Sequence, residues 1–433
     1  MKNLTTTFLA LIYSACAFCQ TTLWQSDTLH HQYFRIPAII AYGDNAIAFS
    51  DNRSGVTDAT VWGDVGSVGN ICIEARFSSD RGNTWSEPKE IVTGFGDGTF
   101  DQSHGDAAVV RDRTTGRLLM MCASGTTGYG RSHASVADNY ATALQVGRYY
   151  STDNGHTWNG RDVTRDIYSI FNNGDNSSSE HVDRLFFASG RICQSRLIKK
   201  GCYYRIYSAL TTNRGALVVY SDDFGTSWHA LGGANANPAP QGDESKIEEL
   251  PDGSVVLSCR MMGGRYFNIF KYADSCHENG TWSEPVASTS TTDGTAAINN
   301  ATNGELLILP VINAKGDNMW LALQSTPRGS EGNHPSNRER RSHVSIYWKA
   351  FANSQQLSDL SQWISGWSRH EVTTGYSAYS TMNAYDNGEL AFLYEDNSVR
   401  FKLGSQHTEV YDVVYRTISL QDITNGEYRY LSK

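Results

Sequence analysis

Short apolar runs bounded by turn residues recur along the whole chain. Two clear examples are SVVLSCRMM at 254–262 and ELLILPVI at 305–312, and Gly or Asn flanks each of them on both sides. Runs of this length between turn-favouring residues are typical of buried β-strands. With 39 Gly among 433 residues and 39% hydrophobic residues, the chain has both the turns and the apolar side chains for a large strand-rich core. The pattern predicts an all-β protein.

A short signature that ends in tryptophan recurs three times between the apolar runs. It reads SSDRGNTW at 78–85, STDNGHTW at 151–158 and SDDFGTSW at 221–228, and a degraded fourth copy covers 274–282. In such a pattern Asp caps a tight turn, Gly supplies a positive φ, and Trp packs the turn against its own strands. We therefore interpret the signature as a structural clasp of a hairpin and not as a catalytic motif.

The spacing of the signature predicts how the strands are organised. The first three copies start 73 and 70 residues apart (151−78 and 221−151), which indicates one supersecondary unit used repeatedly. With roughly 55 to 70 residues for a four-stranded blade, about 410 residues accommodate six blades arranged radially. The sequence predicts a six-bladed β-propeller that forms a single domain over residues 20–433.

The N-terminal segment differs from the rest of the chain. Lys2 is followed by an apolar stretch at 8–18 and by small residues before Gln20, a pattern typical of a secretory signal peptide. We expect residues 1–19 to be this signal, with lipid anchoring at Cys16 as the alternative, and the protein to be secreted, periplasmic or on the cell surface. No later run approaches the roughly 18 apolar residues of a membrane helix, so we expect no membrane span.

Charge and cysteine usage narrow the range of partners. The net charge of −9 argues against a nucleic-acid partner, and an acidic protein that binds an anion must concentrate arginine locally. Because the chain after the signal segment contains neither a CxxC nor an HExxH motif, we expect neither a metal centre nor a cofactor. Six cysteines follow the signal segment, an even number that is compatible with disulfides or with buried thiols, and Cys193 with Cys202 could bridge a hairpin.

The segment FRIP, at 34–37, stands ahead of the repeated signatures. In this combination the chain resembles the exo-sialidases (neuraminidases) of the glycoside hydrolase type, whose repeated signatures are called Asp boxes, over essentially its whole length after the signal. The resemblance implies an enzyme that removes terminal α-linked sialic acid from glycoproteins, glycolipids or oligosaccharides with retention of configuration. A trans-sialidase, or a propeller without catalytic activity that binds glycans or proteins, is the alternative.

The resemblance also implies three arginines that bind the carboxylate of the sugar. The first is Arg35 of FRIP, and the second is Arg260, which stands 16 residues after Glu244. For the third we choose Arg341 in SNRERRSHVSIYW, with Arg340 as the alternative. A guanidinium matches a carboxylate through two parallel hydrogen bonds, which lysine cannot form.

The nucleophile implied by the resemblance is Tyr379, in the segment SAYS at 377–380. The anomeric carbon of sialic acid carries a carboxylate, so an Asp or Glu nucleophile would meet like-charge repulsion, whereas a neutral phenol does not. A phenol with a pKa of about 10 needs a nearby base, for which we expect Glu244. Glu395, in LYE at 393–395, matches the glutamate that orients the first arginine.

The acid that protonates the leaving oxygen is expected in SDNRSGVTDATVWGDVG, at 50–66, which contains Asp51, Asp58 and Asp64. We choose Asp58, five residues after Arg53, and keep Asp64 as the alternative. Arg53 resembles the family's arginine that contacts the oxygen substituents of the sugar. Asp106 resembles the aspartate that contacts the amide or the 4-hydroxyl group.

Overall fold

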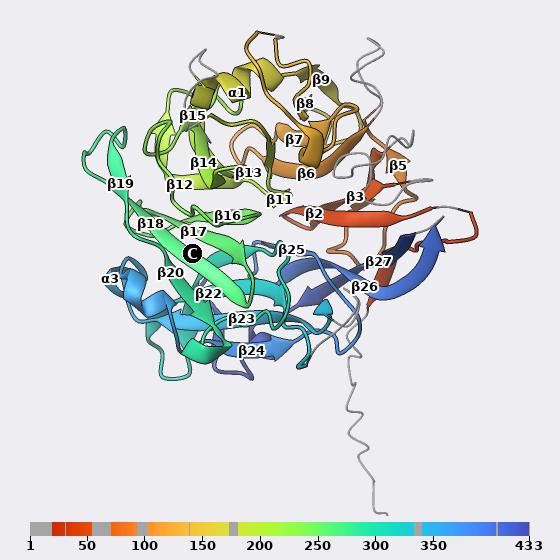
Figure 1. Ribbon diagram of the computed structural model, residues 1–433. Helices are drawn as coiled ribbons and strands as arrows, with labels where there is room; N and C mark the ends of the chain where they lie inside the picture. The colour runs from red at the N-terminus through yellow and green to blue at the C-terminus, as the bar shows by residue number, and fades with distance from the viewer. Residues whose placement is uncertain are drawn as a thin grey trace, which may run out of the picture.

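The computed structural model describes residues 20–30, 32–53, 71–92, 103–137, 139–172, 181–332, 340–403 and 406–432, with the backbone alone at 400–403 and 406–408. Strands dominate this part of the chain (Figure 1). The helices are short: α1 (Thr164–Asn172), α3 (Ser354–Leu357), α4 (Leu420–Ile423), η1 (Tyr129–Arg131), η2 (Ser290–Thr292) and η3 (Leu360–Trp363). The all-β class predicted from the apolar runs is confirmed. No helix within the described ranges is long and apolar enough to cross a membrane.

The largest sheet contains strands from both ends of the chain. Its order is β25-β26-β27-β2-β3-β4-β5, and β1 also pairs with β27. These strands are β1 (Thr21–Trp24), β2 (Phe34–Tyr42), β3 (Asn45–Asn52), β4 (Cys72–Ser78), β5 (Lys89–Glu90), β25 (Ser380–Ala384), β26 (Leu390–Leu403) and β27 (Gln406–Ile418). The pair Phe34 and Tyr411 joins β2 to β27. N-terminal and C-terminal strands are thereby held in one sheet.

Two five-stranded sheets are formed by the first half of the chain. One has the order β11-β6-β7-β8-β9, and the other has the order β10-β13-β14-β15, with β12 paired to β13. Their strands are β6 (His104–Arg111), β7 (Leu118–Ser124), β8 (Gln145–Ser151), β9 (Asn159–Asp162), β10 (Leu185–Phe187), β11 (Gly190–Arg191), β12 (Cys193–Lys200), β13 (Tyr203–Thr212), β14 (Gly215–Ser221) and β15 (His229–Ala230).

Two further five-stranded sheets follow. One has the order β16-β17-β18-β19, with β20 paired to β18, and the other has the order β24-β23-β22-β21-β28. Their strands are β16 (Ser245–Glu249), β17 (Val255–Met261), β18 (Gly264–Tyr272), β19 (Gly280–Trp282), β20 (Val286–Thr289), β21 (Leu306–Asn313), β22 (Asn318–Pro327), β23 (Val344–Phe351), β24 (Ser368–Glu371) and β28 (Tyr428–Tyr430).

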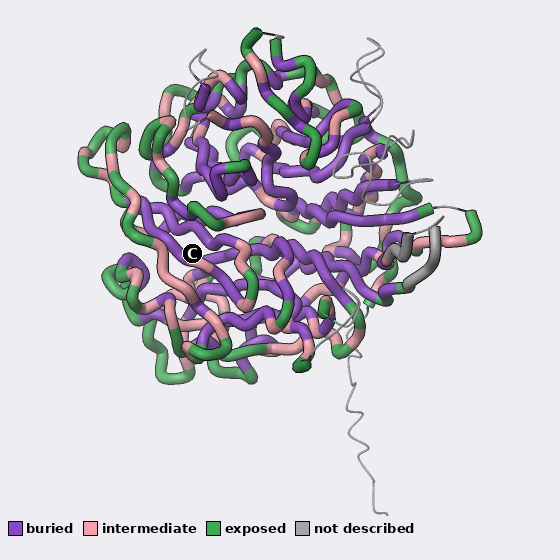
Figure 2. Tube along the Cα trace, in the orientation of Figure 1, coloured by how far each residue is buried: buried purple, intermediate pink, exposed green. Residues whose placement is uncertain are grey.

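The sheets are arranged around a common centre, as in a β-propeller. Contacts between elements run from β2 to β6, from β6 to β10, from β13 to β16, from β16 to β21, from β21 to β25, and from β25 back to β2. In Figure 1, β2, β11, β16 and β25 lie near the middle, whereas β5, β9, β15, β19 and β24 lie toward the outside. Figure 2 shows that buried residues fill the interior. The core lies between neighbouring sheets, where for example Leu119 and Met121 pack with Leu217 and Val219.

The turn of the first signature is closed by its own side chains. Asp80 accepts hydrogen bonds from the backbone N–H of Thr84 at 2.8 Å and from its hydroxyl at 2.6 Å, and Ser78 Oγ accepts from Gly82 N at 2.8 Å. Gly82 has a φ of 83°, and Trp85 Nε1 donates to Gly82 O at 3.0 Å. Equivalent Ser and Asp bonds close the turns at 151–158 and 221–228. The predicted roles of Asp and Gly are confirmed, whereas Trp158 packs against Phe49 of the neighbouring sheet and not only against its own strands.

We expect Gly82→Ala to destabilise the protein more than Gly316→Ala. Both glycines have a positive φ, but a Cβ on Gly82 would lie 2.1 Å from the Tyr415 ring, whereas a Cβ on Gly316 would meet nothing within 4 Å. Both variants therefore lose stability because alanine is strained at a positive φ. Only Gly82→Ala loses about 1 to 3 kcal/mol more, through overpacking against Tyr415. Urea unfolding of the two variants measures the difference. Equal losses would show that the close approach of the turn to Tyr415 has no energetic role.

The six cysteines after the signal segment are all free in the described part of the chain. Cys193 is buried at the start of β12, whereas Cys202 is exposed in the following turn. The bridge that the sequence left open between these two residues is not formed. Burial raises the pKa of the Cys193 thiol to about 12, so this cysteine is an unreactive buried thiol.

Candidate active site

A cavity of about 250 Å³ collects residues that are far apart in the sequence. Four arginines, two carboxylates and two tyrosines contribute to its wall. The lining residues are Arg35, Ile36, Arg53, Tyr129, Asp243, Glu244, Arg260, Arg341 and Tyr379. In this acidic chain, such a concentration of guanidinium groups makes the cavity suited to a small anion.

Tyr379, Glu244 and Arg260 form a hydrogen-bonded group in the wall of the cavity. Tyr379 Oη donates to Glu244 Oε2 at 2.9 Å, and Arg260 Nη1 donates to Tyr379 Oη at 3.1 Å and also to Glu244 Oε2. Strand pairing fixes this geometry. Glu244 directly precedes β16 and Arg260 lies on the adjacent β17, with Arg260 N bonded to Glu244 O at 2.9 Å.

Burial adjusts the protonation of this group. It raises the pKa of the Tyr379 phenol well above its ordinary value, and the charge of Glu244 adds to this effect. Burial also raises the pKa of Glu244, against the lowering effect of Arg260, and Asp243 raises it further. A neutral phenol is therefore held against a carboxylate with increased proton affinity. This is the arrangement that a nucleophile and its general base require.

Glu395 fixes the first arginine and the tyrosine at the same time. Its Oε1 accepts from Arg35 Nε at 2.7 Å and from Ile36 N at 2.9 Å, while its Oε2 accepts from Tyr379 N at 3.1 Å. Ile36 has a φ of 57°, rare for a β-branched residue, at an irregularity in the pairing of β2 with β3. The strained backbone turns Ile36 N toward Glu395, and the strain lies beside the cavity.

We expect Glu395→Gln to lower the free energy of unfolding by about 2 to 3 kcal/mol and to raise KM, because one amide oxygen cannot replace two carboxylate oxygens that accept three donors. Glu389→Gln is the matched control, since Glu389 is partly exposed and its ion pair with Arg81, at 3.6 Å, lies at the surface. Such a surface pair contributes less than about 1 kcal/mol. Urea unfolding and initial rates test both variants. Wild-type KM in Glu395→Gln would argue against the orienting role.

The third arginine of the wall is Arg341. Its guanidinium carbon lies 5.6 Å from the centre of the Tyr379 ring, and that of Arg35 lies 5.5 Å from the same centre. Arg341 O also accepts from Ser377 N at 3.0 Å, and this bond holds the backbone of Arg341 against the SAYS segment. Arg340 is exposed and is absent from the cavity wall. Of the two alternatives, the structure places Arg341 with the other site residues.

Arg53 directly follows β3, lines the cavity and is held by Asp51. Asp51 Oδ2 accepts from Arg53 Nη2 at 2.9 Å and from Nε at 3.2 Å, while its Oδ1 accepts from Asp106 N at 3.0 Å. Burial raises the pKa of Asp51 to about 6, although Arg53 lowers it. Asp106 is fully buried, has a φ of 58°, and does not line the cavity. Its sugar contact therefore stays a prediction.

The acid candidates Asp58 and Asp64 lie outside the described residues, so their distance from the cavity is not given by the structure. Asp51, named in the sequence only as part of the segment expected to hold the acid, instead holds Arg53 and the backbone of Asp106.

Two other residues of the site, Asp243 and Tyr129, were missed from the sequence. Asp243 lines the cavity beside Glu244, and their adjacency was a usable signal. Tyr129 comes from η1 between β7 and β8, where no motif marks it.

Comparison with known proteins identifies the family. The BNR repeat-like domain matches residues 66–430. A sialidase of Paraclostridium sordellii is 26% identical over 388 residues, covering 87% of this chain and 85% of the relative. A sialidase of Micromonospora viridifaciens is 30% identical over 236 residues, covering 52% of this chain and 32% of that protein.

The fold has solved counterparts as well. The intramolecular trans-sialidase from Ruminococcus gnavus, in complex with oseltamivir carboxylate, superposes with a TM-score of 0.63 at 17% identity, and the match covers 93% of this chain and 98% of that one. At this identity the likeness concerns the fold. Together with the family match and the sequence relatives, the observations lead to one conclusion. The chain belongs to the BNR repeat-like domain family and, within it, to the sialidase-type glycoside hydrolases.

Proposed function

We propose that the protein is an exo-α-sialidase that hydrolyses terminal α-linked sialic acid from glycoconjugates with retention of configuration. One observation carries the proposal: Tyr379 Oη donates to Glu244 Oε2 at 2.9 Å in a cavity lined by arginines. The cationic wall suits the carboxylate of the sugar, and the neutral phenol suits attack beside that carboxylate. The named sialidase relatives agree with this substrate class.

In the first step, Arg35, Arg260 and Arg341 bind the carboxylate, and Tyr379 Oη attacks the anomeric carbon. The phenol proton passes to Glu244, and Arg260 Nη1, at 3.1 Å from the oxygen, stabilises the developing negative charge. The bond to the leaving oxygen breaks as that oxygen takes a proton from an acid, for which we propose Asp58. The product of this step is a sugar bonded to Tyr379.

In the second step, a water molecule gives a proton to Asp58 and attacks the anomeric carbon from the side that the leaving group vacated. The bond to Tyr379 breaks, and the phenolate regains its proton from Glu244. Two inversions give net retention. Because the arginines hold the carboxylate throughout, they also stabilise the oxocarbenium-like transition states, so their loss lowers turnover as well as binding.

We further propose that the sheets form six blades. The largest sheet then counts as two, because β25–β27 and β2–β5 are joined through the single pair Phe34 and Tyr411 in the described residues. An experimental structure whose ring closes with another number of blades would contradict this count.

Export through residues 1–19 is also proposed. N-terminal sequencing of the secreted protein should begin at Gln20, and a chain that keeps residues 1–19 would contradict it.

The test of function is incubation with 3′- and 6′-sialyllactose, followed by NMR. We expect free N-acetylneuraminate whose first-formed anomer is α, together with lactose. A β-anomer formed first would exclude retention. Release of an anhydro sugar, or transfer to lactose added in excess, would assign the intramolecular or the intermolecular trans-sialidase reaction, and binding without any release would assign a glycan-binding propeller.

A further inference from the structure

A second cavity, of about 400 Å³, lies at the other end of the central strands. Strand β2 contributes Arg35 and Ile36 to the catalytic cavity through its first residues, and Ile40 and Tyr42 to the second cavity through its last residues. At about 3.3 Å per residue, the two cavities are roughly 20 Å apart. They are separate sites, and the proposed sialidase mechanism makes no use of the second one.

Two arginines at this cavity are held face-on by tyrosine rings. The guanidinium carbon of Arg111 lies 4.1 Å from the centre of the Tyr42 ring, and that of Arg113 lies 3.9 Å from the centre of the Tyr204 ring. Neither arginine forms an ion pair with any residue that the structure describes. Arg111 Nε is buried without a hydrogen bond inside the described protein. Arg113 Nη2 donates to Ser195 O, and stacking on a ring orients a guanidinium while the remaining N–H groups of its edge stay available to a ligand.

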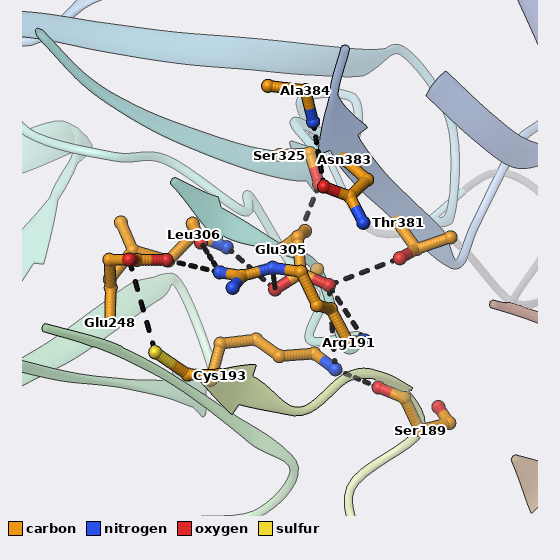
Figure 3. Close-up of polar contacts among 12 residues, drawn as sticks. Ser189, Arg191, Cys193, Glu248, Glu305, Leu306, Ser325, Thr381, Asn383 and Ala384 are labelled. Atoms are coloured by element: carbon orange, nitrogen blue, oxygen red, sulfur yellow. Dashed lines mark hydrogen bonds and ion pairs between the residues drawn. The ribbon is translucent and has the colours of Figure 1, made fainter. Parts of the chain in front are cut away.

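The floor of the cavity is formed by Arg191, which belongs to a buried ionic network (Figure 3). Arg191 pairs with Glu248 and donates to Leu306 O at 2.9 Å, and Lys246 Nζ lies 3.7 Å from Glu305 Oε2. Glu248 also accepts from Arg196 Nη2 at 2.9 Å. Of the residues in this network only Arg191 lines the cavity, and its charge is paired with Glu248. The floor supplies a rigid polar surface but little net charge.

The rest of the wall leaves a positive charge unbalanced. Arg111 and Arg113 face one carboxylate, that of the exposed Asp386, among the described residues of the wall. Asn383 Oδ1 accepts from Ala384 N at 2.9 Å, which leaves its amide N–H groups as donors (Figure 3). One excess positive charge beside amide and guanidinium donors suits a single carboxylate better than a doubly charged phosphate.

We propose that this second cavity binds a small carboxylate-bearing molecule of the size of an acidic monosaccharide. Arg111 and Arg113 bind the carboxylate, and Asn383 with the polar floor accepts the neutral remainder. A net charge of −9 on the whole chain would repel such an anion, so a local pair of unneutralised arginines is what its binding requires. This inference does not depend on the proposed sialidase activity.

The test is calorimetric titration of the full protein with glucuronate, N-acetylneuraminate, inorganic phosphate and neutral lactose. We expect the double variant Arg111→Gln, Arg113→Gln to lose at least tenfold in glucuronate affinity and to lose one of two sites for N-acetylneuraminate. Arg117→Gln is the matched control, since Arg117 also stacks on a tyrosine, at 3.7 Å from the Tyr150 ring, but lies outside the cavity. It should bind like the wild type, and sialoside turnover should be within twofold of wild type in both.

Unchanged affinity in the double variant would overturn the proposal, as would equal binding of lactose or tighter binding of phosphate than of either carboxylate. A crystal structure of the wild-type protein soaked in glucuronate is a second test of binding, and it does not depend on how the variant folds. Density for the sugar acid against Arg111 and Arg113 is expected. Density in the catalytic cavity alone would overturn the second site while leaving the proposed function intact.

Discussion

Tyr379→Phe is expected to lower kcat for sialyllactose by at least about 10³-fold, equivalent to about 4 kcal/mol of activation free energy. The variant keeps the ring beneath Arg35 and Arg341 but removes the oxygen that bonds to Glu244. Binding of the carboxylate by the arginines needs no hydroxyl, so the loss should fall on kcat and not on KM. Steady-state rates with sialyllactose measure this split.

The matched control for this variant is Tyr394→Phe. Tyr394 is also fully buried, on β26, and pairs in the sheet with Ser380, directly after the nucleophile. Its hydroxyl touches neither Glu244 nor the cavity wall, so its loss should change turnover by no more than a few-fold. A Tyr379→Phe enzyme that is as active as Tyr394→Phe would exclude the tyrosine mechanism.

Glu244→Gln is expected to lower kcat by about 10² to 10⁴-fold, the usual contribution of a general base. Gln cannot take the phenol proton, although it can still accept the hydrogen bond. The loss of a buried carboxylate also removes one of the two ion-pair partners of Arg260 and leaves it Asp243 at 3.5 Å, so some rise in KM is expected in addition. Initial rates over a range of sialyllactose concentrations separate the two effects.

The pH dependence of activity tests the role of Glu244 as the base. Glu244 acts only when ionised, and burial raises its pKa above the ordinary value, so activity should fall as the pH drops through that raised pKa. Asp243 raises the same pKa, and Asp243→Asn should therefore shift the acidic limb of kcat/KM to lower pH. An acidic limb that persists unchanged in Glu244→Gln would assign the titration to another group.

Local features of the chain could be predicted from the sequence. Strand class followed from apolar runs, and the clasp at Asp80 and Trp85 followed from residue types a few positions apart, because each depends on the turn itself. Arg35 and Tyr379 were found through short motifs within the family resemblance. Both residues donate hydrogen bonds to Glu395, which stands 360 positions after Arg35. This contact is consistent with the resemblance but could not be derived from spacing.

Features that depend on the pairing of distant strands could not be predicted. Asp51 meets Asp106 only because β3 and β6 belong to neighbouring sheets, and Gly105 allows the approach, since a Cβ there would lie 2.8 Å from Asp51 Oδ2. Tyr129 reaches the cavity from a short helix that has no sequence signal. The choice between Arg340 and Arg341 depended on which of two adjacent side chains faces the cavity, and spacing alone does not settle that.

Covalent capture of the sugar on the enzyme tests the central claim most directly. The nucleophile displaces fluoride from the anomeric carbon of a 2,3-difluorinated sialic acid and becomes bonded to that carbon. The second fluorine slows the hydrolysis of the resulting adduct. Peptide mass spectrometry after brief incubation should find the fluorosialyl group on Tyr379. An adduct on Glu244, or no adduct in an enzyme that still hydrolyses sialyllactose, would contradict the account.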